Sequence, residues 1–236
     1  MKPNTPNQSQ RGAFTLVEML VVIAIITILA SILIPTILRA RVKAKVAIAK
    51  TEMAELAGAI KTYRLDHSRW PVPKGYPANT FGDVSFGYKN QADGKPYFND
   101  TLMKILMAEP LPNQSTVQNK KGSYLTPKDS TDPELEGLPG LSKSRRYHDP
   151  FGNEYKVSLD FNGDGLCADI FYGQPKATKN TAIGLVERRP LKGGVGPDVF
   201  VLKGEVMIWS FGPDKSYSDI KNAVDGENND NILSWR

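Results

Sequence analysis

The most constraining feature of the chain is an apolar run close to its N-terminus. Residues 13–38, AFTLVEMLVVIAIITILASILIPTIL, contain a single charged side chain, Glu18. An apolar run of about 18 residues or more lets a helix cross a hydrocarbon core of about 30 Å. The apolar region of a secretory signal peptide is shorter, about 7 to 15 residues. The run therefore predicts one membrane-spanning helix.

The rest of the chain has the composition of a water-soluble protein. Its mean hydropathy is −0.34, and 23% of its residues are charged. The net charge is +5, and several basic residues directly follow the apolar run. They are Arg39, Arg41, Lys43, Lys45 and Lys50. This position indicates a juxtamembrane cluster rather than a nucleic-acid surface, so no nucleic-acid partner is expected.

Glu18 is the residue that a plain membrane anchor leaves unexplained. A carboxylate at the centre of a spanning helix costs about 2.5 to 3.5 kcal/mol and calls for a partner. A cut before Phe14 would create a free amine one helical turn from Glu18, on the same helix face. If each charge is satisfied by a neighbouring subunit, the pair sets the stagger of an assembly.

The stretch Phe14-Thr15-Leu16-Val17-Glu18, followed by a long apolar helix, resembles the processing signature of type IV pilins and type II secretion pseudopilins. The resemblance implies that a prepilin peptidase cuts between Ala13 and Phe14 and methylates the Phe14 amine. Residues 1–13 would then be a leader, and residues 14–38 the transmembrane and polymerisation helix. The family usually has glycine before the cut, whereas this chain has Ala13, with Gly12 one place earlier.

Pro35 lies 21 residues beyond Phe14, where pilin-like helices commonly carry a proline. Proline removes a helical hydrogen bond and kinks the helix. The kink would allow local stretching of a filament, or it would only bend the helix near its exit from the membrane.

Residues 39–70 are predicted to continue the same helix outside the membrane. Apolar residues recur there at steps of three and four, which is typical of an amphipathic helix. The stripe consists of Val42, Val46, Ala49, Met53, Leu56, Ile60 and Tyr63. The helix is expected to end near residues 67–71, because Pro71 and the residue before it disfavour helix.

The remaining residues, 71–236, are predicted to form a globular head. Residues 71–100 are expected to be loop and turns, 101–108 a short helix, and 111–146 an inserted loop. Apolar segments between turn residues indicate short strands at 154–159, 169–172 and 206–209. The predicted fold class is α+β: a long N-terminal helix packed on a small antiparallel sheet, as in pilins.

Residues 160–165, DFNGDG, place oxygen-bearing side chains at the spacing that begins an EF-hand loop. Asp160, Asn162 and Asp164 are therefore candidate calcium ligands. However, the twelfth position is Phe171 instead of glutamate, and no helical pattern flanks the segment. The pattern favours a tight hairpin turn over a metal site.

Two C-terminal segments, residues 210–214 and 225–235, resemble the calcium loop of major pseudopilins, and residues 149–155 resemble another segment of those proteins. The resemblance implies calcium bound by Asp214 and Asp230, with Asp225 as a further ligand. Backbone oxygens of Phe211 and Ser216 would complete the shell. The segment between Asp214 and Asp230 is longer than in the family, and a solvated acidic loop is the alternative.

The single cysteine, Cys167, cannot form an internal disulfide that would close this loop. The sequence contains no recognisable motif for a catalytic site. The two histidines lack metal-binding companions, and neither a phosphate-cradling glycine motif nor a nucleophile elbow is present. The chain is not expected to be an enzyme.

The resemblance implies a structural subunit of a pseudopilus, anchored in a bacterial inner membrane by a single span with its C-terminal domain in the periplasm. Expected partners are further copies in a helical filament, other pseudopilins, the prepilin peptidase, and the assembly platform with its ATPase. The charge bias around the span alone would place the head in the cytoplasm. A pilin of a surface fibre and a membrane-anchored binding or enzymatic head are the alternatives.

Overall fold

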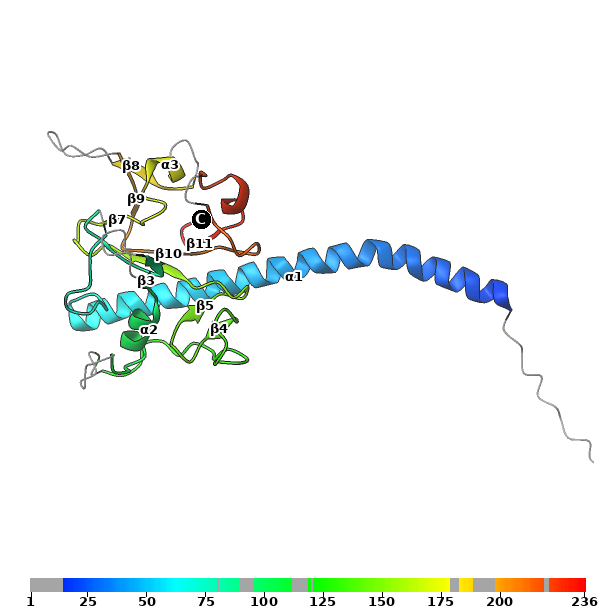
Figure 1. The fold of residues 1–236 in the computed structure, drawn as a ribbon, viewed down its shortest axis with the longest axis horizontal. Helices are drawn as coiled ribbons and strands as arrows, with labels where there is room; N and C mark the ends of the chain where they lie inside the picture. Colours follow the sequence, from blue (N-terminus) through cyan, green and yellow to red (C-terminus); the bar gives the residue numbers. More distant parts are fainter. Residues whose placement is uncertain are drawn as a thin grey trace, which may run out of the picture. The chain divides into compact units, whose positions relative to one another are not determined.

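The computed structural model describes residues 15–79, 81–89, 96–111, 119, 121–178, 183–188, 198–218 and 221–236. The chain divides into two compact units, Met1–Lys43 and Ala44–Arg236. One helix, α1 (Leu16–His67, 52 residues), contributes its first part to one unit and its second part to the other (Figure 1).

The first part of α1 has apolar side chains on every face. Ile23, Ile28 and Ile32 are 60 to 64% exposed, and the other large apolar residues from Leu16 to Leu38 are also exposed. The few hydroxyl groups donate to carbonyls of the same helix, as Thr27 does to Ile23 (2.7 Å). By length and composition this helix can cross a membrane. Its backbone hydrogen bonds lie within the helix, as lipid requires, except for the one that Pro35 removes.

The second part of α1 is amphipathic and packs on the head. Its buried residues are Ala49, Met53, Leu56, Ala59, Ile60 and Tyr63. These confirm most of the predicted apolar stripe. Val42, the first residue of that stripe, lies in the first unit and is 40% exposed. The helix ends at His67, and Ser68 follows with a positive φ of 53°, close to the predicted end.

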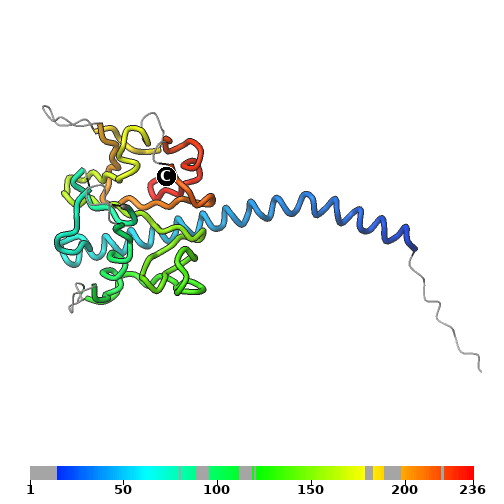
Figure 2. The backbone as a smooth tube through the Cα atoms, viewed as in Figure 1, coloured from blue at the N-terminus to red at the C-terminus, as the bar shows by residue number. Residues whose placement is uncertain are grey.

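A four-stranded antiparallel sheet lies against this part of α1. It consists of β1 (Val84–Phe86), β6 (Lys156–Leu159), β10 (Val206–Ser210) and β11 (Ile232–Leu233), in the order β1-β6-β10-β11. Leu159 of β6 pairs with Val84 on one side and with Val206 on the other. The orange β10 segment runs beside α1 in the backbone trace (Figure 2). The predicted α+β fold, a long helix on antiparallel strands, is confirmed.

Strand β10 shows why this sheet is a middle layer. All five of its residues are buried. Val206 and Ile208 pack in the core that contains α1, whereas Met207 and Trp209 pack in a second core on the opposite face. Because successive side chains of a strand point to opposite faces, one uninterrupted apolar strand can join two cores.

The remaining elements lie outside this sheet. They are β2 (Tyr88–Lys89), β3 (Pro96–Tyr97), α2 (Asp100–Leu106), β4 (Gly140–Leu141), β5 (Tyr147–His148), β7 (Leu166–Cys167), α3 (Pro175–Thr178), β8 (Val186–Arg188), β9 (Val199–Lys203) and the 3-10 turn η1 (Gly226–Asn228). Helix α2 confirms the predicted short helix. Strands β7, β9 and β8 form a separate sheet in that order.

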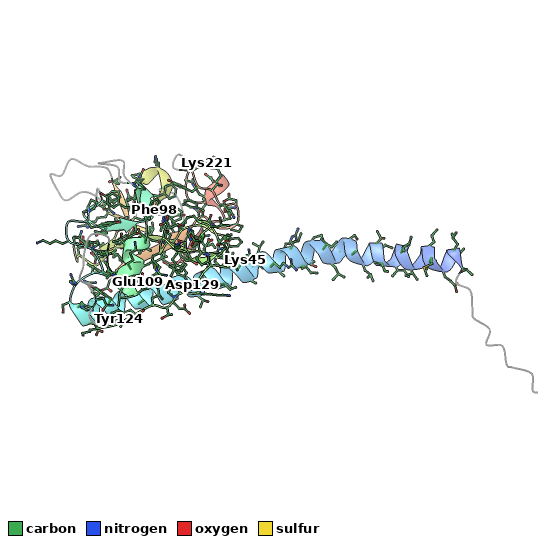
Figure 3. All side chains as sticks on the ribbon, turned by 60° about the horizontal axis from the view of Figure 1, so that its bottom comes forward. Lys45, Phe98, Glu109, Tyr124, Asp129 and Lys221 are labelled. Carbon is green, nitrogen blue, oxygen red and sulfur yellow. The ribbon has the colours of Figure 1, made fainter. Side chains whose placement is uncertain are left out.

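The segment 121–146 reaches the C-terminal end of α1. Tyr124 lies at the cyan end of that helix in Figure 3, and its hydroxyl donates to Asp66 Oδ2 (2.6 Å). The Tyr124 ring also meets Tyr63 edge-on, with centroids 5.6 Å apart. These contacts fix the segment to the end of the helix.

Several predictions about the head were wrong. Residues 169–172 form a turn instead of a strand, because Asp169 Oδ1 accepts the backbone N–H groups of Phe171 (2.9 Å) and Tyr172 (3.0 Å). Residues 71–100, expected to be loop, contain strands β1, β2 and β3. The strands there were missed because they are only two or three residues long.

Shortening Leu56 to alanine tests the packing of α1 on the head. Leu56 is fully buried in the core, so Leu56→Ala should lower the free energy of unfolding by about 2 to 5 kcal/mol. Leu65→Ala is the matched control, because Leu65 is 82% exposed, and its effect should stay within about 0.5 kcal/mol. Denaturant unfolding of the full chain in detergent, followed by tryptophan fluorescence, measures both. Equal losses would show that the helix is not docked.

Candidate functional site

The N-terminus of α1 is closed by a reciprocal pair of side chains. Thr15 donates its backbone N–H (2.8 Å) and its hydroxyl (2.6 Å) to Glu18 Oε2, while Glu18 N–H reaches back to Thr15 Oγ1 (3.2 Å). This is a capping box, and the spacing Thr-x-x-Glu before an apolar run is its sequence signature. That signal was present in the sequence and was missed.

The capping box gives Glu18 a role inside its own chain. One oxygen of the carboxylate, Oε2, is used at the helix start, and no described residue supplies a partner for Oε1. Ala13 and Phe14, the predicted cleavage and methylation residues, lie outside the described residues. A cut at that bond would leave the Thr15–Glu18 box intact, because both residues remain in the shortened chain.

Pro35 lies inside α1, which continues through it. Proline has no N–H to donate to the carbonyl of Ser31, so the helix loses one bond there. The next residue, Thr36, donates its hydroxyl to Leu33 O (2.8 Å) and Ile32 O (3.3 Å). The ribbon of α1 bends in its blue part (Figure 1). The role of Pro35 in the bend stays a prediction.

Two acidic residues of the C-terminal segments meet in the head. Asp214 donates its backbone N–H to Asp230 Oδ2 (3.0 Å), and Asp214 Oδ1 accepts the N–H of Ser216 (2.9 Å). Gly212 makes the approach possible: its φ is +74°, and a Cβ there would lie 2.1 Å from the Asp230 backbone oxygen. Residues 210–214 and 230 therefore form one compact loop pair, the C-terminal acidic loop.

The Asp230 carboxylate is poorly satisfied in this loop. Its Oδ1 is buried and accepts no hydrogen bond from the described residues. Burial raises the pKa of Asp230, and the nearby negative charge of Asp214 raises it further, although backbone N–H donors oppose both. A buried carboxylate oxygen without a donor is a place where a cation would be favourable.

The oxygen donors here fit calcium better than a transition metal, since calcium prefers carboxylate and carbonyl oxygens. Asp214 and Asp230 are together, and Phe211 and Ser216 flank Asp214 in the chain. Asp225 is not connected to them: its described contacts are backbone bonds with Asn222 and Asn228. Within the described residues, no three His, Cys, Asp or Glu side chains cluster around one point.

A second turn, residues 149–153, holds the acidic loop in place. Asp149 is fully buried, and its Oδ1 accepts the N–H groups of Phe151 and Asn153 (both 2.8 Å). Its Oδ2 accepts the Ser210 hydroxyl (2.7 Å), and the Asn153 amide donates to Gly212 O (2.8 Å). This turn therefore fixes both the start and the glycine of the acidic loop.

The other candidate metal segment is a hydrogen-bonded turn. Asp160 Oδ1 accepts the N–H of Gly163 (2.8 Å), and its Oδ2 accepts the N–H of Gly165 (2.9 Å). Asn162 Oδ1 accepts the Asp164 N–H (2.9 Å), and Asp164 is paired with Arg188 (2.5 Å). The expected hairpin is wrong, because β6 and β7 belong to different sheets. The backbone donors already use both oxygens of Asp160.

Asp83 anchors the same turn from the opposite side. It is 1% exposed and accepts the N–H of Phe161 (3.1 Å) and of Ala168 (2.7 Å). Burial raises the pKa of Asp83 to about 6, and the charge of Asp160 contributes to this increase. No pattern in the sequence singles out Asp83, because it lies in a segment expected to be loop.

The first unit has a match among known sequence families. The prokaryotic N-terminal methylation motif matches residues 8–34, which include Phe14 and Glu18. The chain has a prepilin-type N-terminus. This prepilin-type N-terminus includes the capping box and most of the exposed apolar part of α1. Together they fit a single-pass membrane anchor.

Several relatives carry the same name, type II secretion system core protein G. The one from Klebsiella pneumoniae is 42% identical over 65 residues, which are 28% of this chain and 46% of the relative. The one from Pseudomonas aeruginosa is 37% identical over 62 residues, 26% of this chain and 44% of the relative. The chain thus spans less than half the length of these curated relatives. No solved structure matches the chain.

These findings confirm the resemblance that the sequence indicated, to pilin-like proteins and to type II secretion pseudopilins in particular. The structure brings some of the predicted site residues together and separates others. The structure places Thr15 beside Glu18 and Asp214 beside Asp230. It leaves Asp225 apart from that pair, and the segment 160–165 has its own hydrogen bonds.

The raised pKa of Asp83 predicts a pH dependence of stability. Burial raises the pKa of the Asp83 carboxyl from its ordinary value of 3.8 to about 6 in the folded protein, so folding favours the protonated form. The stability contributed by this group is complete below about pH 4 and is lost as the pH rises through about 6. The loss has a slope of at most about 1.4 kcal/mol per pH unit.

Asp83→Asn should remove this pH-dependent contribution to stability. Denaturant unfolding between pH 4 and pH 7 should then give a flatter dependence of the free energy of unfolding on pH than in the unchanged protein. Asp132→Asn, at an exposed position, is the control and should leave the profile unchanged. Parallel profiles for the unchanged protein and Asp83→Asn would contradict the assignment.

Proposed function

We propose that the chain is a structural subunit of a pseudopilus of a type II secretion system and is not an enzyme. The observation that carries the proposal is the methylation motif at residues 8–34 on a helix whose apolar first part is exposed on every face. The names of the relatives support the secretion system over a surface fibre or an anchored enzymatic head.

Processing would begin with the cut between Ala13 and Phe14 by a prepilin peptidase, followed by methylation of the new amine. The precursor would lie in the bacterial inner membrane with its leader inside and its head in the periplasm. The assembly platform and its ATPase would then move subunits, with other pseudopilins, into a helical filament. The apolar parts of α1 would form the core of that filament.

Glu18 would serve assembly through its charge as well as through its capping contacts. Before assembly, Thr15 satisfies one carboxylate oxygen at the helix start. The second oxygen is available to the Phe14 amine of a neighbouring subunit, which would set the stagger between the two helices. Capping requires only a hydrogen-bond acceptor at this position, whereas pairing with an amine requires the negative charge.

Calcium would bind at the C-terminal acidic loop. Asp214 and Asp230 would hold it, with backbone oxygens of Phe211 and Ser216 as further ligands. The ion would neutralise two carboxylates that repel each other and would satisfy the buried Asp230 Oδ1. It would thereby fix segments 16 residues apart that no disulfide joins, since Cys167 is free and buried.

The capping and charge roles of Glu18 are separable by substitution. Glu18→Gln keeps an acceptor for the Thr15 contacts but removes the charge, so subunits should still enter the membrane and be cut before Phe14 but should fail to form filaments. Thr15→Ala removes the box and keeps the charge, so filaments should form. Electron microscopy of overproduced filaments and N-terminal sequencing of the membrane-bound subunit measure the two steps.

Normal filaments from Glu18→Gln would contradict the role of the charge. A chain that still begins at Met1 in cells containing the peptidase would contradict the proposed processing, and the protein would then be an ordinary anchored one.

Removal of calcium should destabilise the head. The melting temperature of the full chain in detergent should rise on addition of calcium and fall again with a chelator. Asp214→Asn together with Asp230→Asn should abolish the increase, while retaining acceptors for the backbone donors. Glu187→Gln, at an exposed position, is the control. A calcium response that survives the double substitution would place the ion elsewhere or exclude it.

A further inference from the structure

The first unit contains a charged feature to which the proposed assembly role of Glu18 assigns no function. Directly after Leu38, α1 carries Arg39, Arg41 and Lys43, here called the basic collar. All three side chains are exposed, and none forms an ion pair or hydrogen bond with another described residue. No acidic residue occurs between Glu18 and Glu52. The collar therefore has no counter-charge nearby on its own helix.

The spacing of the collar places its charges around the helix. With about 100° per residue, Arg39 and Lys43 lie roughly 40° apart, and Arg41 lies on the opposite side. The three residues span only about 6 Å along the axis. A protein partner docking on one face would meet two of these side chains at most. Positive side chains on opposite sides of a helix can all be bound together only by surroundings that enclose the helix.

The expected depth of the collar in a bilayer indicates that these surroundings are lipid headgroups. From Leu16 to Leu38 the helix rises roughly 33 Å, close to the about 30 Å of a hydrocarbon core. The collar would then lie at the level of the lipid headgroups, where long basic side chains extend their charges into the polar layer. Headgroups there that carry net negative charge are the phosphate esters of anionic phospholipids.

We propose that the basic collar binds anionic phospholipid headgroups around the C-terminal end of the span. The proposal rests on insertion of α1 in a membrane, which is part of the proposed function. Anionic lipids would hold the unassembled subunit at a fixed depth. A subunit that leaves the membrane would have to exchange these lipid contacts for others, so the lipid composition would bias the release of subunits.

Lipid selectivity measures this interaction directly. The full chain is reconstituted in phosphatidylcholine vesicles with a trace of spin-labelled phosphatidylglycerol or spin-labelled phosphatidylcholine, and electron spin resonance gives the fraction of each label bound. We expect a preference for phosphatidylglycerol of at least about twofold, which decreases at high salt because exposed charges are screened. Resistance to carbonate extraction confirms that the span is inserted.

Arg39→Gln, Arg41→Gln and Lys43→Gln together should reduce the preference to about one. The matched control is Lys61→Gln, Lys176→Gln and Lys203→Gln, which removes the same charge from exposed positions of the second unit and should retain the preference. An inserted, unchanged chain without lipid preference would overturn the proposal, as would a collar variant that keeps it.

Salt-sensitive self-association that depends on the collar, without lipid selectivity, would also overturn the proposal and assign the collar to contacts between subunits. Extraction of the chain by carbonate would instead contradict the membrane span itself, so failure of the proposed function is distinguishable from failure of the collar.

Discussion

The structure depends on one helix that has to be stable in two different surroundings. In the first part of α1 the apolar side chains are exposed, and in the second part an apolar stripe is buried against strands. Apart from the bond lost at Pro35, the backbone of α1 is hydrogen-bonded within the helix, so the same conformation suits lipid and a docked surface. Only the side chains change along α1, from apolar on every face, through a basic collar, to amphipathic.

In the head, the four-stranded sheet is a middle layer: one face packs on the second part of this helix, and the other face packs on a second core. Val206 and Ile208 seal the core against α1, while Met207 and Trp209 bind the strand to the second core. The acidic loop follows this strand directly in the chain. Ser210, the last residue of the strand, donates its hydroxyl to Asp149 and so ties the start of the loop to the adjacent turn. The geometry of the loop is thus set by the strand and the adjacent turn, and a cation would add closure to a loop that is already positioned.

The sequence was sufficient to predict those features that a pattern over many residues or an unusual residue specifies. The apolar run, the amphipathic stripe through Leu56 and the resemblance at residues 14–18 all extend over many positions or depend on unusual chemistry. The strands of residues 71–100 were missed because two or three residues carry no measurable period. The strand expected at 169–172 failed because Asp169 binds its own following N–H groups, a local preference that outweighs β propensity.

The position of Glu18 explains how a charged residue is tolerated in the span. Glu18 lies one turn or less from the start of α1, so it would sit within roughly 3 Å of the first helical residue along the axis. The cost of a carboxylate is greatest at the bilayer centre and falls towards the interface. The capping box reduces the cost further, because Thr15 donates two hydrogen bonds to the carboxylate. In a membrane, a charge so near the end of the helix would cost less than one at the bilayer centre, and the proposed pairing with the amine of an adjacent helix would use this same position.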